Sequence, residues 1–218
     1  MRDIFTAELS ALGEDLAAMS RLVETAVASA GTALLTADLA LAEEVILDDH
    51  TIDSMERDLD ERCVRLIAQQ QPVAHDLRVI VSGLRMSASL ERMGDLARHI
   101  AEIARMRFPG TVVPPELLPT ITRMHEASVQ VSQQVTNVIE TRDLELAAAI
   151  EANDDLLDEL HASTFVATAT LIVTAQQAVD ITLLARFYER FGDHAVSIAR
   201  RVVYLVTGEA PADRGSTI

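Results

Sequence analysis

Leu90-Glu-Arg-Met-Gly-Asp95 recurs 98 positions later as Tyr188-Glu-Arg-Phe-Gly-Asp193, which indicates that the chain contains two equivalent halves. Over residues 90–104 and 188–202, seven of fifteen positions are identical. Upstream, Asp38-Leu-Ala-Leu-Ala42 returns as Asp143-Leu-Glu-Leu-Ala147, at an offset of 105. The two offsets differ by about two helical turns, as expected if both arms of a helical hairpin were shortened by about one turn. We infer that the chain is an internal duplication.

Prolines and glycines divide the chain into helical segments. Residues 1–71 and 120–210 contain no proline, whereas the stretch between the two copies is rich in proline and glycine: Pro109, Gly110, Pro114, Pro115 and Pro119. Such a cluster ends helices and predicts a linker between two halves. Apolar residues at helical spacing predict helices over about 5–36, 38–71, 73–106, 115–141, 143–173 and 178–207, with Asp38 as an N-cap and Gly208 closing the last helix.

The pattern predicts an all-α fold made of two tandem, pseudo-symmetric three-helix bundles with six long helices. We expect the first bundle over 1–108, a Pro-rich linker over 109–116, the second bundle over 117–210 and a tail over 211–218.

Composition narrows the function. The 218 residues include 34 acids and 18 bases, all of them arginine, for a net charge of −16. This balance argues against a nucleic-acid binder and against an anionic membrane surface. Cys63 is the sole cysteine, which excludes an internal disulfide, and its apolar register predicts a buried structural thiol.

No segment reads as a signal peptide or a membrane span. Residues 162–179 carry no charge, but they contain serine, threonine and glutamine, and we expect a buried hairpin there. The protein is therefore expected to have no transmembrane segment and to be cytoplasmic.

Pairs of acids four residues apart occupy equivalent places in the two halves. Residues four apart share a helix face. In an antiparallel hairpin that turns at Pro72, the midpoint of 49 and 95, two such pairs come level, ~30 Å from the turn. The second half repeats this geometry. The first quartet is Asp49, Asp53, Glu91 and Asp95, and the second is Asp154, Asp158, Glu189 and Asp193.

Four carboxylates at the edge of a core repel one another unless they are protonated or neutralised. Oxygen-preferring cations are the economical solution, so we expect one metal site in each half. Iron, manganese, magnesium and calcium are the candidates, rather than metals that prefer thiolate ligands. The competing interpretation is a solvated acidic face, neutralised by nearby arginines: Arg57, Arg92, Arg98, Arg190 and Arg200.

Histidines add less to these sites. His99 follows Asp95 by four residues and His161 follows Asp158 by three, so both are candidate additional ligands. The sequence contains no Glu-x-x-His, no Gly-rich phosphate loop and no nucleophile elbow. Gly94 and Gly192, one inside each Glu-x-x-x-Asp, predict close approach of another helix or a ligand.

These residues resemble the PhoU family of phosphate-signalling regulators along essentially the whole chain. The resemblance rests on Asp49-x-x-x-Asp53, on Gln71-Pro72-Val73-x-x-Asp76-Leu77-Arg78, on the two Glu-Arg-x-Gly-Asp stretches and on residues 202–208. One departure is that the second hairpin lacks the Gln-Pro-Val turn, where Asp180 is the nearest acid.

The resemblance implies multinuclear metal clusters, commonly iron, at the two quartets. It also implies a cytoplasmic, non-enzymatic negative regulator of the phosphate-starvation response and of phosphate transport. Such a protein links the phosphate-specific ABC transporter to a sensor histidine kinase, and lies at the inner face of the plasma membrane through these partners. Long amphipathic helices favour a homodimer. The alternatives are a metal-dependent hydrolase that uses the carboxylates, and an acidic helical scaffold without metal.

Overall fold

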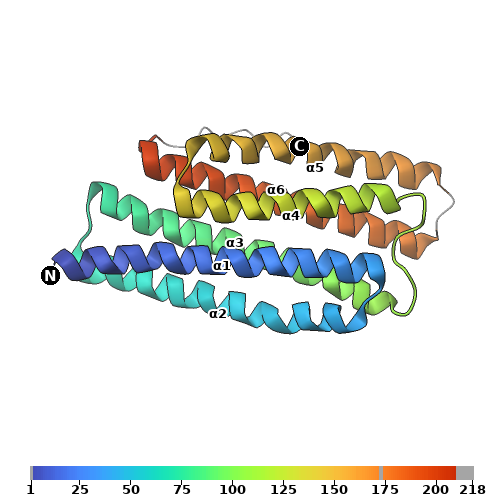
Figure 1. Ribbon diagram of the computed structural model, residues 1–218, viewed down its shortest axis with the longest axis horizontal. Coiled ribbons are helices and arrows are strands. Elements are labelled where there is room, and N and C mark those ends of the chain that lie inside the picture. The colour runs from blue at the N-terminus through green and yellow to red at the C-terminus, as the bar shows by residue number, and fades with distance from the viewer. Residues whose placement is uncertain (1, 172–173, 210–218) are drawn as a thin grey trace.

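The computed structural model describes residues 2–171 and 174–209 and is built from long helices (Figure 1). Its elements are α1 (Arg2–Thr36), α2 (Leu39–Gln70), α3 (Ala74–Arg107), α4 (Leu118–Thr141), α5 (Leu144–Thr170) and α6 (Ala175–Thr207). No strand occurs in the described ranges, and none of these helices is long and apolar enough to cross a lipid bilayer. The all-α prediction is confirmed, although α4 begins at Leu118, after the last proline-rich turn, rather than near residue 115.

Local chemistry explains where the helices begin and end. The Asp38 carboxylate accepts a hydrogen bond from the Leu41 amide (3.0 Å), and Asp143 accepts bonds from the Glu145 and Leu146 amides (2.8 and 3.2 Å). Both caps satisfy amides that would otherwise lack a partner. Thr174 and Gln177 form a reciprocal capping box at the start of α6, and Gly208 ends it with a φ of 78°.

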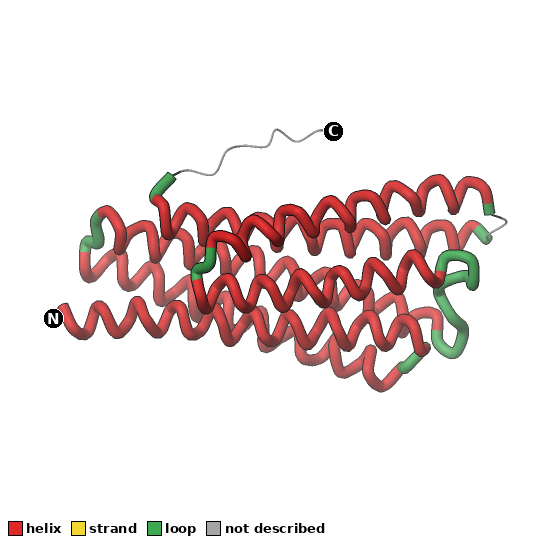
Figure 2. The backbone as a smooth tube through the Cα atoms, turned by 45° about the horizontal axis from the view of Figure 1, so that its top comes forward, coloured by secondary structure: helices red, strands yellow, loops and turns green. Residues whose placement is uncertain are grey.

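The helices form two antiparallel three-helix bundles that lie side by side. Helices α1, α2 and α3 pack on one another, as do α4, α5 and α6, and the bundles meet where α1 packs on α4 and α3 packs on α6. The tube in Figure 2 shows the hairpins running along one long axis, with the connection between α3 and α4 at one end. The pseudo-symmetric arrangement expected from the duplication is therefore present.

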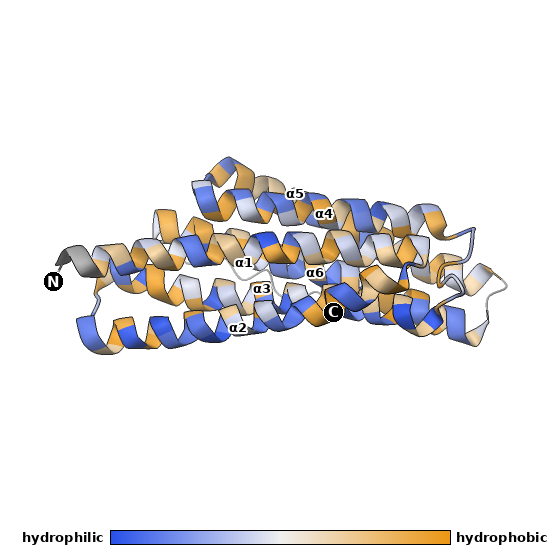
Figure 3. Ribbon diagram, turned by 60° about the horizontal axis from the view of Figure 1, so that its bottom comes forward, coloured by the Kyte–Doolittle hydropathy of each residue, from blue (hydrophilic) through white to orange (hydrophobic). Residues whose placement is uncertain are grey.

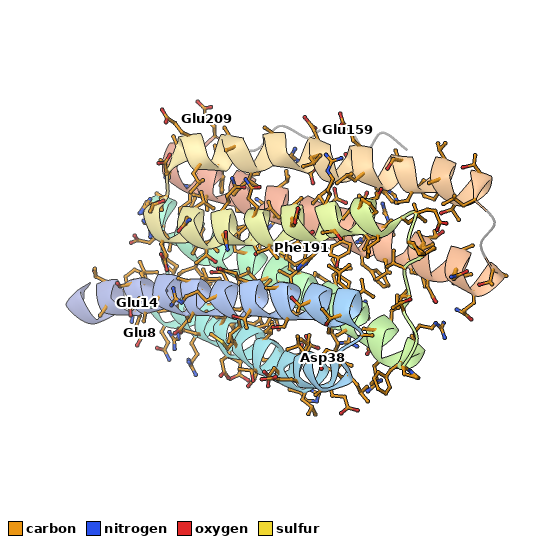
Figure 4. All side chains as sticks on the ribbon, turned by 45° about the vertical axis from the view of Figure 1, so that its right-hand side comes forward. Glu8, Glu14, Asp38, Glu159, Phe191 and Glu209 are labelled. Carbon is orange, nitrogen blue, oxygen red and sulfur yellow. The ribbon has the colours of Figure 1, made fainter. Side chains whose placement is uncertain are left out.

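Hydrophilic and hydrophobic residues are interspersed along the helices in Figure 3, and the separation into apolar and polar faces is clearest in α4 and α6 and weakest in α5. The apolar residues at helical spacing on α1 are largely buried, including Leu12, Leu16, Met19 and Val23. Buried residues from all six helices form one continuous hydrophobic cluster. Figure 4 shows Phe191 inside this core and acids such as Glu14 and Glu159 directed outward.

The expectation of a buried hairpin over residues 162–179 is wrong in one respect. The hairpin forms, with α5 ending at Thr170 and α6 starting at Ala175, and residues 172–173 lie outside the described part of the chain. Phe165, Val166 and Val179 are 51%, 68% and 54% exposed, however. Among the described helices, α5 packs on α4 and α6 alone, which leaves these apolar side chains uncovered by the other helices.

Cys63 is fully buried, as predicted, and its Sγ lies 3.8 Å from the Ile80 carbonyl oxygen. Burial is the main reason that the pKa of this thiol rises to about 11. A neutral thiol in this position acts as a small apolar side chain.

Candidate metal centres

The first quartet lies on the facing sides of α2 and α3. Asp49 is buried (7% exposed), and its side chain is close enough to Asp53 and Asp95 for their charges to act on it. Burial raises the pKa of Asp49, Arg98 opposes this rise, and the two aspartates add to it. Burial, followed by Asp95, likewise raises the pKa of Glu91. The fold therefore brings the four predicted acids into one electrostatic group.

Two arginines neutralise this first quartet. Arg98 is central, because its Nε lies 2.7 Å from Asp49 Oδ2 and its Nη2 lies 2.7 Å from Asp95 Oδ1. Its third nitrogen, Nη1, donates to Glu102 at 2.7 Å. Arg92 donates to Asp95 Oδ2 at 2.9 Å and pairs with Glu91 Oε2 at 3.3 Å. The Arg98 side chain thus bridges α2 and α3 at the place where the sequence predicts a metal ion.

The second quartet lies between α5 and α6 and is far less neutralised. Asp154 Oδ1 and Glu189 Oε2 are buried and have no hydrogen-bond partner. Burial, followed by the charges of Asp158, Asp193 and Glu189, raises the pKa of Asp154 to about 7. Arg186 donates to Glu189 Oε1, and this is the basic side chain that enters the group from its own helix. Buried carboxylate oxygens without a partner are costly unless a proton or a cation reaches them.

The two sites differ at one decisive position. The repeat offset of 98 residues places Val196 where the first half has Arg98, and Val196 is buried among apolar neighbours. The second quartet therefore lacks the internal cation that crosses the first. The difference between Arg98 and Val196 is visible in the sequence. The contact between Arg98 and Asp49 is not, because it depends on how α2 and α3 pack.

The glycines inside the motifs mark close helix approach, as predicted. A Cβ built at Gly192 would lie 2.4 Å from Asp154 Oδ1 and 2.8 Å from Leu157 Cδ1. A Cβ at Gly94 would meet the Ile52 side chain at 3.0 and 3.2 Å. Side chains of α5 and α2 thus lie directly over these two positions of α6 and α3.

Within residues 2–171 and 174–209, no three His, Cys, Asp or Glu side chains converge closely enough to hold one ion. The acids are grouped but their oxygens do not point at a common centre. A shared ion at the second quartet would use the partnerless oxygens of Asp154 and Glu189, with Asp158 and Asp193 at its more exposed side. An all-oxygen ligand set of this kind suits a hard cation.

The two candidate histidines are placed differently. The His99 ring stacks on Phe187 of α6 at a centroid distance of 5.2 Å, so it faces the seam between the bundles. His161 lies against Phe165 at 4.9 Å, and its buried Nε2 has no hydrogen-bond partner. Burial and Arg186 lower the pKa of His161, against the opposing effect of Asp158. A neutral imidazole beside Asp158 is the form that can bind a metal.

One arginine that contacts the second quartet was not predicted from the sequence. Arg186 precedes Glu189 by three residues, which is ion-pair spacing on a helix, but it was absent from the set of arginines expected to neutralise the acids. Arg92 and Arg98 from that set do contact the first quartet, whereas Arg200 pairs with Glu151 at 3.0 Å.

Similarity to known proteins covers nearly the entire chain. The family model described as PhoU domain matches residues 16–104 and again residues 121–202. A Mycobacterium leprae protein described as phosphate-specific transport system accessory protein PhoU homolog 1 is 42% identical over 219 residues, covering 98% of this chain and 97% of that protein. A Mycobacterium tuberculosis PhoU homolog 2 is also 42% identical, over 97% of this chain and its own full length.

Solved structures agree. The crystal structure of PhoU from Pseudomonas aeruginosa superposes with a TM-score of 0.88 at 33% identity, over 94% of this chain and 100% of that chain. The phosphate transport system regulatory protein PhoU from Streptococcus pneumoniae gives a TM-score of 0.86 at 25% identity, over 95% and 99% of the two chains. Two copies of the domain, arranged as in these crystal structures, account for the internal repeat, and the chain belongs to the PhoU family.

Proposed function

We propose that this chain is a non-catalytic accessory protein that restrains phosphate uptake and the phosphate-starvation response. The observation that carries the proposal is its 42% identity, over 97–98% of its length, to proteins described as phosphate-specific transport system accessory proteins. The acidic surface, with a net charge of −16, favours protein partners over nucleic acid.

Its partners in this proposal are the cytoplasmic face of a phosphate ABC transporter and a sensor histidine kinase. The protein would work in the cytoplasm, at the inner face of the plasma membrane through these partners, and as a homodimer. The description of its relatives as accessory proteins of a phosphate-specific transport system supports this placement.

The proposal includes a metal at the second quartet. Asp154, Asp158, Glu189 and Asp193 would hold it, with His161 at the edge, and iron, manganese, magnesium, calcium and zinc are the candidate ions. The bound ion would supply positive charge to acids of which, among the described residues, only Glu189 forms an ion pair, with Arg186. In the first quartet Arg98 already supplies such charge, since it joins Asp49 of α2 to Asp95 of α3.

The role of these residues is to fix the faces that partners recognise. Asp154 and Asp158 tie α5 to Glu189 and Asp193 of α6 only when their mutual repulsion is relieved. Relief stiffens the hairpin over the length of the second bundle, so that one rigid surface is presented to the transporter and the kinase.

Deletion of the gene tests the function. Cells that lack the protein should express phosphate-uptake genes in high phosphate, and the wild-type gene should restore repression. Unchanged expression in the deletion strain would reject the proposed role. Complementation with Glu189→Gln then tests the second quartet, because this variant keeps the side-chain shape and removes the charge.

Metal content is measured separately on protein purified without chelator. We expect at least one equivalent of metal in the wild type and a marked loss in the Asp154→Asn, Glu189→Gln double variant. Arg123→Gln, an exposed position on α4, is the matched control. Metal below about a tenth of an equivalent in the wild type would leave the helical scaffold as the explanation of the quartets.

A further inference from the structure

The antiparallel seam between α3 and α6 keeps one register along its length. The His99 ring stacks on Phe187, and seven residues earlier on α3 the charge of Arg92 acts on His194. A further seven residues back, Arg85 acts on Arg201, and Arg78 lies against Gly208. Each step of seven on α3 is matched by a step of seven on α6, which is the repeat of a regular antiparallel helix pair.

This register places two guanidinium groups opposite each other across the seam. Arg85 is exposed and Arg201 is half-buried. Burial, and the positive charge of Arg85, lower the pKa of Arg201, so the two side chains repel each other. Within residues 2–171 and 174–209, neither of them forms an ion pair.

The helix turns that adjoin Arg85 and Arg201 carry no acid, which is unusual in this sequence. Although the chain has 34 acids, the residues one turn from Arg85 are Val81, Ser82, Ala88 and Ser89, and those one turn from Arg201 are Ser197, Ile198, Tyr204 and Leu205. The same register brings Ser89 of α3 level with Ser197 of α6, beside the two arginines. The Ser89 hydroxyl donates to the Arg85 carbonyl oxygen at 3.1 Å, so the group offers two guanidinium groups and the Ser197 hydroxyl, and the adjacent turns of α3 and α6 carry no carboxylate.

Arg78 extends this basic group toward the end of the molecule. Its guanidinium lies over Gly208, where a Cβ would be 2.9 Å from Nη1, and its buried Nε has no hydrogen-bond partner. Seven residues of helix separate it from Arg85, about 10 Å along the axis. By contrast, Arg92, further along the seam, already pairs with Asp95 and Glu91.

We propose that Arg85 and Arg201, with Ser89 and Ser197 beside them, form a binding site for a tetrahedral oxyanion of the phosphate class. A guanidinium presents paired N–H donors that match the oxygens of such an anion. One anion between the two arginines replaces their repulsion with two attractive contacts. A longer phosphate chain would reach toward Arg78. The site lies on the seam between the bundles and is independent of the metal quartets.

The experiment measures the melting temperature of the full chain in phosphate, in pyrophosphate and in chloride at matched ionic strength, with and without EDTA. Phosphate at millimolar concentration should raise the melting temperature of the wild type by about 2–4 °C over chloride. Arg85→Gln and Arg201→Gln should lose this rise, and each should melt above the wild type in chloride because the repulsion is gone. Arg123→Gln, on the exposed face of α4, should respond as the wild type does.

Three outcomes would overturn the site. The first is an equal melting temperature in phosphate and in chloride. The second is a rise in phosphate that is undiminished in both Arg85→Gln and Arg201→Gln. The third is a rise that disappears with EDTA, which would mean that phosphate binds to a metal ion instead. Comparison of pyrophosphate with phosphate distinguishes the ligand length: a larger shift with pyrophosphate that Arg78→Gln removes supports the extended site. Since metal content is a separate measurement, failure here leaves the proposed regulatory function untouched, and failure of that function leaves this site untouched.

Discussion

Arg98 and Val196 hold equivalent positions in the two repeats and give the two acidic quartets different properties. Arg98 joins Asp49 and Asp95 with two 2.7 Å contacts, whereas Val196 is buried and offers no charge. A guanidinium and a metal ion compete for the same oxygens, because both need the unshared electron pairs of the carboxylates.

Exchange of these two residues should exchange the metal-binding properties of the sites. Arg98→Val frees Asp49 and Asp95, so we expect the chain to bind about one more equivalent of metal than the wild type. Val196→Arg places a guanidinium at the position equivalent to Arg98, beside Asp154 and Asp193, and should lower the metal content. Equilibrium dialysis followed by elemental analysis measures both.

The control for this exchange is Arg98→Lys, which keeps the charge and should leave metal content near the wild-type value. Equal metal binding by wild type, Arg98→Val and Val196→Arg would show that the arginine does not decide occupancy. Circular dichroism of each variant establishes that the helices have formed.

Asp154 should make the stability of the metal-free protein depend on pH. Its pKa is about 7 in the folded chain, against an ordinary value of 3.8, so the folded state holds a proton that the unfolded state releases. Its contribution to stability is complete below about pH 4 and is lost as the pH rises to 7 and above.

Asp154→Asn should remove this dependence. With allowance for solvent screening, we expect the free energy of unfolding of the variant to exceed that of the wild type by on the order of 1 kcal/mol at pH 8, which corresponds to about 2–4 °C in melting temperature. Near pH 4 the two proteins should be equally stable. Thermal unfolding in EDTA at both pH values measures the difference. A variant that is less stable at pH 8 would contradict the burial of an unpartnered carboxyl.

At the scale of the elements, the closeness of α5 to α6 should make Gly192 less replaceable than Gly94. Alanine at 192 would place its Cβ 2.4 Å from Asp154 Oδ1, and the carboxylate or the helix must move. We expect Gly192→Ala to lower the free energy of unfolding by about 1–3 kcal/mol. At Gly94 the contact is the end of the flexible Ile52 side chain at 3.0 Å, and the better helix propensity of alanine, about 1 kcal/mol, offsets it.

Chemical denaturation of the two variants measures the contrast, with Gly13→Ala as the reference, because no atom lies within 4 Å of a Cβ built there. Gly13→Ala should stabilise α1 slightly. A Gly192→Ala protein as stable as Gly13→Ala would show that α5 and α6 are further apart than described.

Helix positions could be predicted from the sequence because local signals decide them. Asp38, Pro72 and Gly208 begin or end helices through their own backbone chemistry, and the structure confirms each. The grouping of the acids also follows from helical spacing and the hairpin turn. The Arg98 bridge, the orphaned oxygens of Asp154 and Glu189, and the position of His99 against Phe187 depend on side-chain packing between helices, which spacing alone does not determine.

At the scale of the whole molecule, the two bundles share one core. Buried residues of α1 and α4, and of α3 and α6, belong to the same hydrophobic cluster. At the end of α3, Arg107 holds the buried Asp180 of α6 through two hydrogen bonds, of 2.7 and 3.0 Å. Each bundle therefore relies on the other to cover part of its apolar surface.

Such a shared core predicts a single cooperative unfolding transition of the full chain. Differential scanning calorimetry should give one peak whose calorimetric and van't Hoff enthalpies agree. Two resolved peaks, each assignable to one repeat, would mean that the bundles fold independently. Arg107→Ala, which leaves Asp180 without its guanidinium partner, should lower the melting temperature without splitting the peak.

The segment between α3 and α4 has a consequence for how the halves associate. Two separate bundles with these faces would pair only at a sufficient protein concentration. The covalent connection makes their pairing intramolecular, with an effective concentration in the millimolar range for a short linker. Gene duplication followed by fusion has therefore made the contact between the two bundles, and with it the position of Arg85 opposite Arg201, independent of protein concentration.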